Sequence, residues 1–311
     1  MKVVISINSS FKNYVFNDEK KLPICYFTAI NLIPAFQKRG HDIVLVHPED
    51  VSPMNEVPFE KLYEFKNNFF KEVDPTNYVN PDLFYVMELG ENLNSVESKK
   101  FVKGLNELEN KVKLMLNSAR ATQYELKDVQ KTLDAPFIPS YDIKTNEDLI
   151  SAVQKSEKGI IAKPIIGLQG YGVTYITQKN VYEFTKKQNI SDYVYEQYIS
   201  ANYELRVLFI DSKILFARKK FVDGKPANDS VMGYEFVNLS KYHKDITNSI
   251  IKSTGMFAGS VDFRDKYVQE INGSGIGLVV KKRENGVVKK DEILYDLTNF
   301  MVEKMEEKFK R

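Results

Sequence analysis

Residues 163–173 read KPIIGLQGYGV and residues 256–277 read MFAGSVDFRDKYVQEINGSGIG, and these two stretches decide the fold. The chain has only 15 glycines, and six of them lie here: Gly167, Gly170 and Gly172 in the first stretch, Gly273, Gly275 and Gly277 in the second. The first stretch joins two β-rich runs, which predicts a hairpin tip whose backbone N–H groups can face phosphates, with Lys163 at its base. The glycine order fits neither a Rossmann fingerprint nor a P-loop. An exposed hairpin with a surface lysine is the alternative.

Three oxygen-bearing side chains characterise the second stretch. Glu270 and Asn272 are two residues apart in a predicted strand, so they point to one face, and Asp262 lies on the preceding predicted strand. Mg²⁺ prefers such hard oxygen ligands, with one or two carboxylates and substrate phosphates. Solvent-exposed acids are the alternative reading. The apolar surroundings weaken it, because buried carboxylates need partners.

Composition excludes several other classes of protein. Lys plus Arg is 44 and Asp plus Glu is 42, a net charge of +2 that argues against nucleic-acid binding through bulk charge. No apolar run is long enough to span a membrane, and the N-terminus lacks the pattern of a signal peptide. One cysteine, Cys25, allows no internal disulfide and indicates a cytoplasmic protein, and with three histidines it makes a zinc site improbable.

Hydrophobic patterning predicts an α/β protein. A strand at 3–7, a helix at 24–39 and a strand at 42–46 form a βαβ unit of a parallel sheet. Further along, we expect helices at 120–133 and 145–157, and β-rich runs dominate after residue 158. The chain closes with a predicted helix whose apolar stripe is Ile293, Leu294, Leu297, Phe300, Met301 and Met305.

The motifs together resemble the ATP-grasp superfamily, in particular the branch of bacterial glutathione synthetase and the ribosomal-protein glutamate ligases. The resemblance runs from about residue 112 to 308. Lys163–Val173 matches the family's K-P-x-x-G-x-x-G-x-G-V hairpin, and the closing G-x-D … E-x-N motif is present at 259–262 and 270–272. Further matches are Asn117, Lys127, the hinge Glu196-Gln197-Tyr198-Ile199 with Glu and Gln exchanged, Glu204 and Arg206 in a D-x-R-V motif with Glu for Asp, Arg218, and Asn228 at looser spacing.

The resemblance implies an ATP-grasp fold behind an N-terminal parallel α/β (pre-ATP-grasp) domain. We expect this domain at 1–111, a central subdomain with the glycine-rich lid at 112–190 and a C-terminal subdomain with the metal site at 191–311. The resemblance implies that Lys127 and Lys163 bind the α/β-phosphates and that Gly167, Gly170 and Gly172 form the lid over them. It implies that the nucleotide is bound by Glu196, Gln197, Tyr198, Ile199 and Glu204, with Asn228 on the phosphate side. Arg206 and Arg218 would contact the transferred phosphoryl group, and two Mg²⁺ ions, with Mn²⁺ as an alternative, would be bound by Asp262, Glu270 and Asn272.

The implied activity is ATP-dependent carboxylate–amine ligation through an acyl-phosphate, on an amino acid, a dipeptide or a ribosomal peptide. A peptide maturase forming side-chain esters or amides is the alternative within the class. An ATP-binding regulatory protein without turnover and a kinase-type enzyme are alternatives outside it. The resemblance also implies a homodimer. This chain departs from glutathione synthetase at 87–91, 232–233 and 273–275, so glutathione synthesis is disfavoured, and the second glycine cluster could make room for a large acceptor.

Overall fold

The computed structural model describes residues 1–7, 24–66, 69–87, 95–167, 170, 172–221, 233–273, 277–284 and 287–311. A six-stranded sheet contains the N-terminal strands in the order β4-β3-β2-β1-β5-β6. β1 is parallel to β2 and β5, and β5 to β6, so the predicted parallel α/β unit is confirmed. Its elements are β1 (Lys2–Ser6), α1 (Ile24–Lys38), β2 (Asp42–Val46), η3 (Pro48–Asp50), β3 (Leu62–Lys66), β4 (Phe69–Val73), η4 (Pro75–Tyr78), β5 (Leu83–Val86), α2 (Ser95–Glu109) and β6 (Leu114–Leu116).

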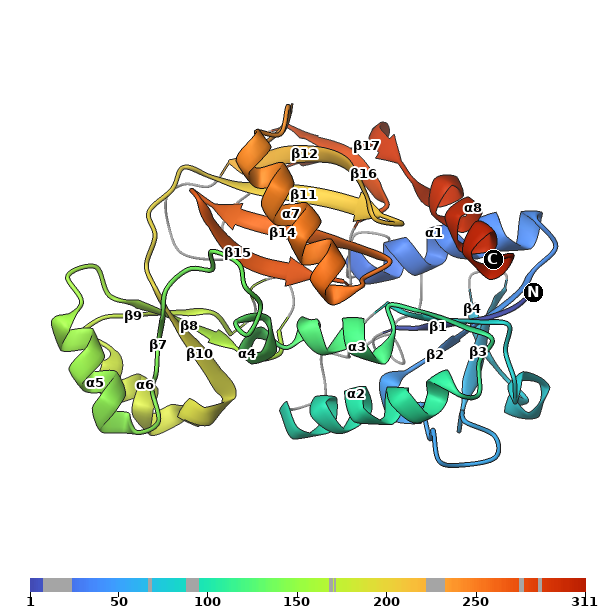
Figure 1. Cartoon of the computed structure of the whole chain (residues 1–311), viewed down its shortest axis with the longest axis horizontal. Coiled ribbons are helices and arrows are strands. Elements are labelled where there is room, and N and C mark those ends of the chain that lie inside the picture. Colours follow the sequence, from blue (N-terminus) through green and yellow to red (C-terminus); the bar gives the residue numbers. More distant parts are fainter. Residues whose placement is uncertain are drawn as a thin grey trace.

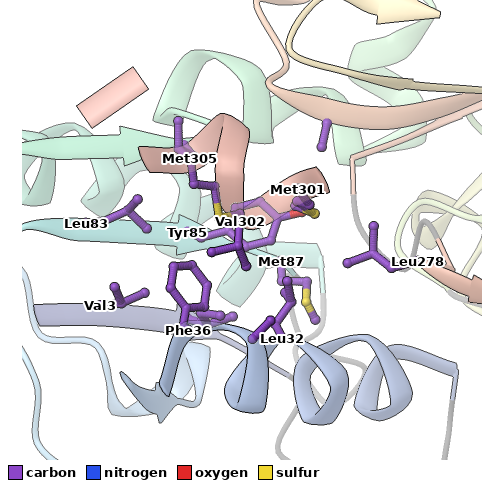
Figure 2. Close-up of a cluster of buried hydrophobic side chains, with 14 of the residues drawn as sticks. Val3, Leu32, Phe36, Leu83, Tyr85, Met87, Leu278, Met301, Val302 and Met305 are labelled. Atoms are coloured by element: carbon purple, nitrogen blue, oxygen red, sulfur yellow. The ribbon is translucent and has the colours of Figure 1, made fainter. Parts of the chain in front are cut away.

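Helices cover both faces of this sheet. Successive residues of a strand point to opposite faces, and here both sets are apolar, so each face needs a covering layer. Val3 and Ile5 belong to a core shared with α1 and with the C-terminal helix α8 (Thr298–Phe309). Val4 faces the other way, into a core with α2. Figure 1 shows α1 and α8 side by side with α2 across the sheet, and Figure 2 shows how α8 reaches the strands.

A four-stranded antiparallel sheet follows, in the order β7-β10-β8-β9. Two helices pack against it through Leu149, Val153, Val181 and Phe184. The first begins with a capping box, in which Thr145 and Asp148 satisfy each other's backbone N–H groups. The elements are β7 (Ser140–Tyr141), α5 (Asn146–Lys155), β8 (Ile160–Pro164), β9 (Thr174–Ile176), α6 (Val181–Lys187), η6 (Ile190–Asp192) and β10 (Tyr193–Gln197).

The third sheet has five antiparallel strands in the order β13-β12-β11-β14-β15. The tight turn between β11 and β12 uses Asp211 and Ser212, both with positive φ. A separate pair of strands, β16 and β17, then leads into α8. The elements are β11 (Tyr203–Ile210), β12 (Lys213–Phe221), β13 (Gly233–Val237), α7 (Lys241–Thr254), β14 (Ala258–Arg264), β15 (Tyr267–Asn272), β16 (Val279–Glu284) and β17 (Val287–Asp296).

Two predicted helices differ from the structure. The helix expected at 120–133 is broken into α3 (Ala119–Thr122), η5 (Gln123–Glu125) and α4 (Lys127–Gln130). Leu126 interrupts it with extended φ and ψ, and the next N–H, that of Lys127, donates to Ile165 of another segment instead of continuing the helix. The terminal helix begins only at Thr298, whose N–H donates to the Asp296 side chain, and Ile293 is an exposed residue of β17.

The strand pairing crosses the predicted subdomain limits at two places. β6 lies after residue 111 but pairs with β5 in the first sheet. β10 lies after residue 190 but pairs with β7 and β8 in the second sheet. The division at 111 and 190 therefore stays a prediction. Among the described residues, no helix combines the length and apolarity needed to cross a membrane.

Candidate nucleotide and metal site

The three predicted metal-binding residues lie together on the third sheet. Asp262 of β14 is directly opposite Glu270 of β15, with a bulge one residue further along that pair. Asn272 donates from its side-chain amide to the Asp262 carboxylate over 3.4 Å. Because residues directly opposite in antiparallel strands share a face, these oxygen donors point to the same side of the sheet. Two carboxylates and an amide are a donor set that suits Mg²⁺.

The two predicted catalytic arginines continue the same row. Arg206 of β11 is opposite Asp262 on one side and opposite Arg218 of β12 on the other. Its guanidinium holds the Asp262 carboxylate bidentately, with N–O distances of 2.7 and 2.6 Å. Although burial alone would lower it, the Asp262 charge raises the pKa of Arg206 above its ordinary value. The row therefore runs from Arg218 through Arg206 and Asp262 to Glu270 across four strands.

Arg218 is buried, and among the described residues no carboxylate forms an ion pair with its guanidinium. Its side chain is 8% exposed. The guanidinium lies 4.7 Å from the centre of the Tyr234 ring and 3.5 Å from the Tyr295 hydroxyl. Burial lowers the pKa of Arg218, and the neighbouring positive charge of Arg206 acts in the same direction. A buried cation in this setting is prepared to receive an anion, because desolvation costs it free energy until one binds.

Two predicted phosphate-binding lysines come from different segments, and each reaches β15 beside Glu270: Lys127 through the Glu270 carboxylate, and Lys163 through the Gln269 carbonyl, to which its ammonium donates at 3.4 Å. Lys127, at the start of α4, contacts Glu270 at 3.0 Å and donates to the Gly167 carbonyl at 3.0 Å. Lys163, at the end of β8, contacts Glu196 of β10 at 2.6 Å. β8 and β10 are adjacent antiparallel strands, which places the pair on one face. Both lysines are buried.

A third lysine, Lys131, belongs to this group and was not predicted. Its ammonium lies 2.5 Å from the second oxygen of Glu196 and 3.2 Å from the Ile138 carbonyl, and 5.0 Å from the Phe137 ring centre. Burial lowers the pKa of Lys131. One sequence signal could have indicated it, namely its position four residues after Lys127, which places both on one side of a helical segment.

The predicted hinge residues differ in how deeply they are buried and in what they contact. Glu196 is 2% exposed, and although burial raises its pKa, the charges of Lys163 and Lys131 keep that pKa below the ordinary glutamate value. Gln197 is exposed. Tyr198 packs against Tyr175 with ring centres 5.2 Å apart, and the Ile199 carbonyl accepts from Arg264 at 3.4 Å.

Glu204 lies in a network of its own. Its carboxylate accepts from Lys220 at 3.1 Å, from Gln269 at 3.2 Å and from Arg264 at 3.4 Å. Burial raises its pKa, but the charges of Lys220 and Arg264 lower it below the ordinary value. These contacts give Glu204 a role in joining β11, β12, β14 and β15.

The glycines of the first cluster allow a close backbone approach. Gly170 and Gly172 have φ near +73° and +74°, in the left-handed region that favours glycine. A Cβ on Gly172 would lie 2.7 Å from Cγ of Pro164, at the other side of the hairpin. Three residues of the hairpin (168, 169 and 171) and the predicted phosphate-side Asn228 lie outside the described residues.

A local contact explains why position 273, the first of the second cluster, is a glycine. A Cβ on Gly273 would lie within 2.5 Å of the Glu125 carboxylate, which accepts a hydrogen bond from the Gly273 N–H. Glycine at this position therefore permits a contact within the protein. Gly277 has φ of +64°, and Gly275 lies outside the described residues.

Comparisons with known proteins show the fold. No model of a known protein family matches the sequence, and no curated protein matches it either. Among solved structures, the chain is similar to the ATP-grasp ligase PsnB complexed with minimal precursor, Mg and ADP, at 15% identity over 99% of this chain and 98% of that one, with a TM-score of 0.57. It is similar to the D-cycloserine synthetase DcsG at 10% identity over 99% and 100%, with a TM-score of 0.63.

A third similar structure is the macrocyclase MdnC bound with precursor peptide MdnA from Microcystis aeruginosa MRC, at 13% identity over 88% of this chain and 91% of that one, with a TM-score of 0.52. Identities this low establish architecture rather than activity. The chain has the fold of the ATP-grasp ligases, as its motifs predicted.

Proposed function

We propose that this protein is an ATP-dependent ligase that joins a carboxylate to an amine through an acyl-phosphate, with release of ADP and phosphate. The observation that carries the proposal is the charge of the site, where five cationic side chains and three carboxylates from the third sheet, the second sheet and the α4 segment lie around the predicted metal donors. They are Lys127, Lys131, Lys163, Arg206 and Arg218, against Glu196, Asp262 and Glu270. A nucleoside triphosphate with divalent metal suits this surplus.

The residues fit this chemistry because phosphoryl transfer needs positioning and charge neutralisation. Lys127 and Lys163 would hold ATP phosphates, and Asp262, Glu270 and Asn272 would hold magnesium. When bound, magnesium supplies neutralisation of the charge that develops on the phosphate oxygens. The Arg206 guanidinium lies 2.6 Å from the Asp262 carboxylate. With a metal ion on that carboxylate, the guanidinium would also contact the phosphates.

The reaction then proceeds in two steps with balanced bonds. A substrate carboxylate oxygen bonds to the γ-phosphorus, and the bond from that phosphorus to the β,γ-bridging oxygen breaks, so ADP leaves. The amine nitrogen next bonds to the acyl carbon, phosphate leaves with the electron pair, and the amine loses a proton. Arg218 would hold the acyl-phosphate through its planar guanidinium. The glycine-rich hairpin would exclude water that could hydrolyse it.

A peptide maturase is the second candidate. The structures of PsnB and MdnC that resemble this chain are complexes with a precursor or precursor peptide, and they match over most of its length. DcsG, by its name a synthetase of a small molecule, matches as well, so both substrate sizes need to be tried. Two metal ions, Mn²⁺ in place of Mg²⁺, a homodimer and a cytoplasmic location are further proposals, to be checked by metal titration, light scattering and cell fractionation.

The test supplies purified protein with ATP, Mg²⁺ and either amino-acid pairs or peptides rich in Asp, Glu and Lys. We expect ADP and phosphate release that depends on the acceptor, and a product lighter by one water than the sum of its parts. Lys163→Met and Asp262→Asn should reduce turnover about a hundredfold or more. Lys187→Met and Asp245→Asn, at exposed positions, are the matched controls.

Three results would contradict the proposal. Nucleotide binding without turnover on any substrate would favour a regulatory protein. A product that retains phosphate would indicate a kinase-type enzyme. Turnover unchanged in Lys163→Met and Asp262→Asn, with circular dichroism confirming that both variants fold, would show that the site lies elsewhere.

A further inference from the structure

The outer edge of β15 is covered without a neighbouring strand. β15 is the last strand of its sheet, so the N–H and C=O groups that point away from β14 need other partners. At Val268 these partners are main-chain groups, since its N–H donates to Pro136 at 2.9 Å and its carbonyl accepts from Ile138 at 3.1 Å. Beyond Val268 the partners change to side chains.

At Ile271 a single side chain, that of Gln130, bonds to both the N–H and the C=O group. The Ile271 N–H donates to Oε1 of Gln130 at 3.0 Å, and Nε2 of Gln130 donates to the Ile271 carbonyl at 2.8 Å. The amide of Gln130 thus replaces the peptide group that a further strand would supply. Gln130 is 2% exposed, so water cannot readily substitute for either bond.

At Gly273 two more side chains complete the edge. The N–H donates to the Glu125 carboxylate, and the carbonyl accepts from the Asn117 amide at 2.9 Å. Asn117 also accepts from the N–H of Phe257 at 2.9 Å, which ties the start of β14 to the same residue. The outward residues 268, 271 and 273, with the β-bulge between the first two, are therefore all held by the segment 117–138, in which η5 and α4 contact β15 (α4 and β15 are labelled in Figure 1).

The Gln130 contact falls between two of the predicted metal-binding residues. Ile271 separates Glu270 from Asn272, and its own side chain is buried in the core on the opposite face. Lys127, three residues before Gln130 on α4, contacts the Glu270 carboxylate at 3.0 Å. One short helix therefore fixes both the backbone at Ile271 and the side chain beside it.

We infer that Gln130 is a positioning residue for the metal site, which sets the backbone of β15 so that Glu270 and Asn272 face the same ion. This inference rests on the proposed function, because it needs the site to bind metal with nucleotide. Groups that orient ligands are typically worth 10- to 100-fold in metal affinity. Edge covering alone, a purely structural role, would leave metal affinity unaltered in a folded variant.

The test compares Gln130→Met with Asn180→Leu. Asn180 makes an equivalent pair of main-chain bonds, accepting from Thr177 N–H at 2.7 Å and donating to the Tyr175 carbonyl at 2.9 Å, but on the second sheet. Mn²⁺ binding is measured by electron paramagnetic resonance at saturating ADP, ADP binding without metal by calorimetry, and hydrogen exchange on peptides spanning 266–273.

We expect Gln130→Met to weaken Mn²⁺ binding about tenfold or more, with ADP binding without metal unaltered and exchange at 266–273 faster. Asn180→Leu should lower the melting temperature with Mn²⁺ binding unaltered. In Gln130→Glu, burial favours the neutral carboxyl, which can accept from the Ile271 N–H and donate its O–H to the Ile271 carbonyl, so this variant should fall between wild type and Gln130→Met. It serves if Gln130→Met does not fold.

The outcomes separate the two proposals. Faster exchange at 266–273 with Mn²⁺ binding equal to wild type would overturn the positioning role and leave the proposed function standing. Exchange at 266–273 equal to wild type would also overturn the positioning role, because it would show that the Gln130 contact does not hold the β15 backbone. Absence of Mn²⁺·ADP binding in wild type would overturn the proposed function and the positioning role together, whatever the exchange shows.

Discussion

Glu196 carries its charge between the buried Lys163 and the partly buried Lys131, and we expect the stability of the fold to depend on this arrangement. Its oxygens lie 2.6 Å from Lys163 and 2.5 Å from Lys131. Glu196→Gln leaves these two cations without their counter-charge, so we expect the free energy of unfolding to fall by about 3–5 kcal/mol. Glu183→Gln breaks a fully exposed pair with Lys187, and solvent screening should leave its free energy of unfolding close to that of wild type. Urea unfolding measures both, and equal effects would contradict the prediction.

The same carboxylate predicts a pH dependence of stability. Because the pKa of Glu196 is lower in the folded protein than in the unfolded chain, the unfolded chain binds more protons at acid pH. Its stabilisation is therefore complete above the unfolded value of about 4.3 and is lost as pH falls through the folded pKa. Glu196→Gln should lose less stability than wild type between pH 5 and 3, on a scale of ~1.4 kcal/mol for each unit of pKa difference. Identical slopes would contradict the assignment.

At the residue scale, the sequence allowed the kinds of groups to be predicted, whereas their partners depend on strand register. Asp262, Glu270 and Asn272 were identified by type and spacing, and they do lie together. That Arg206 faces Asp262 follows from the β11–β14 pairing, which no local signal contains. The spacing from Lys127 places Lys131 on the same side of a helical segment, but no local signal gives its partner, because Glu196 is 65 residues away on β10 of the second sheet.

At the scale of elements, local signals predicted those elements whose stability is local. Helix α5 has its own capping box, and the strands β1, β2 and β5 are continuous apolar runs. The expected helix at 120–133 is broken because the Lys127 N–H bonds to the Ile165 carbonyl of another segment instead of to a helical carbonyl. Such competition cannot be read from propensity alone.

The glycine-rich hairpin gives a prediction at the same scale. Ala at Gly172 must adopt φ of +74° and place its Cβ 2.7 Å from Pro164 Cγ. Gly40→Ala is the matched control, with φ of +76° and no atom within 4 Å of the Cβ. Each should lose about 1–2 kcal/mol of stability from backbone strain. Only Gly172→Ala should weaken ATP binding measured by calorimetry, because the hairpin must shift. Equal ATP affinities in the two variants would show that the hairpin does not contact nucleotide.

At the scale of the whole molecule, the chain closes on itself through α8. This helix, formed by the last residues described, completes a core with the first strand and with α1 (Figure 2). The apolar stripe of residues 297–305 was predicted as a core face, but nothing in the sequence indicates that its partner is the N-terminal sheet. Arg39 and His41 add contacts to Glu306 of α8, at 3.0 and 2.6 Å. The two ends of the chain are therefore held together by packing and by charge.

Met305 tests this closure, because its side chain is fully buried between α8 and the strands, far along the chain from α1 and β1. Met305→Ala should leave a cavity and reduce the free energy of unfolding by about 2–5 kcal/mol. Met54→Ala, at a methionine that is 82% exposed, should stay within about 0.5 kcal/mol of wild type. Since Met305 lies in the core with α1 and β1, and none of the described contacts of the proposed site involves it, ADP·Mg²⁺ affinity should be the same in both folded variants. Denaturation followed by circular dichroism and calorimetry measure the two quantities. If Met305→Ala were as stable as Met54→Ala, α8 would not be part of the N-terminal core, and the ends of the chain would be stabilised independently.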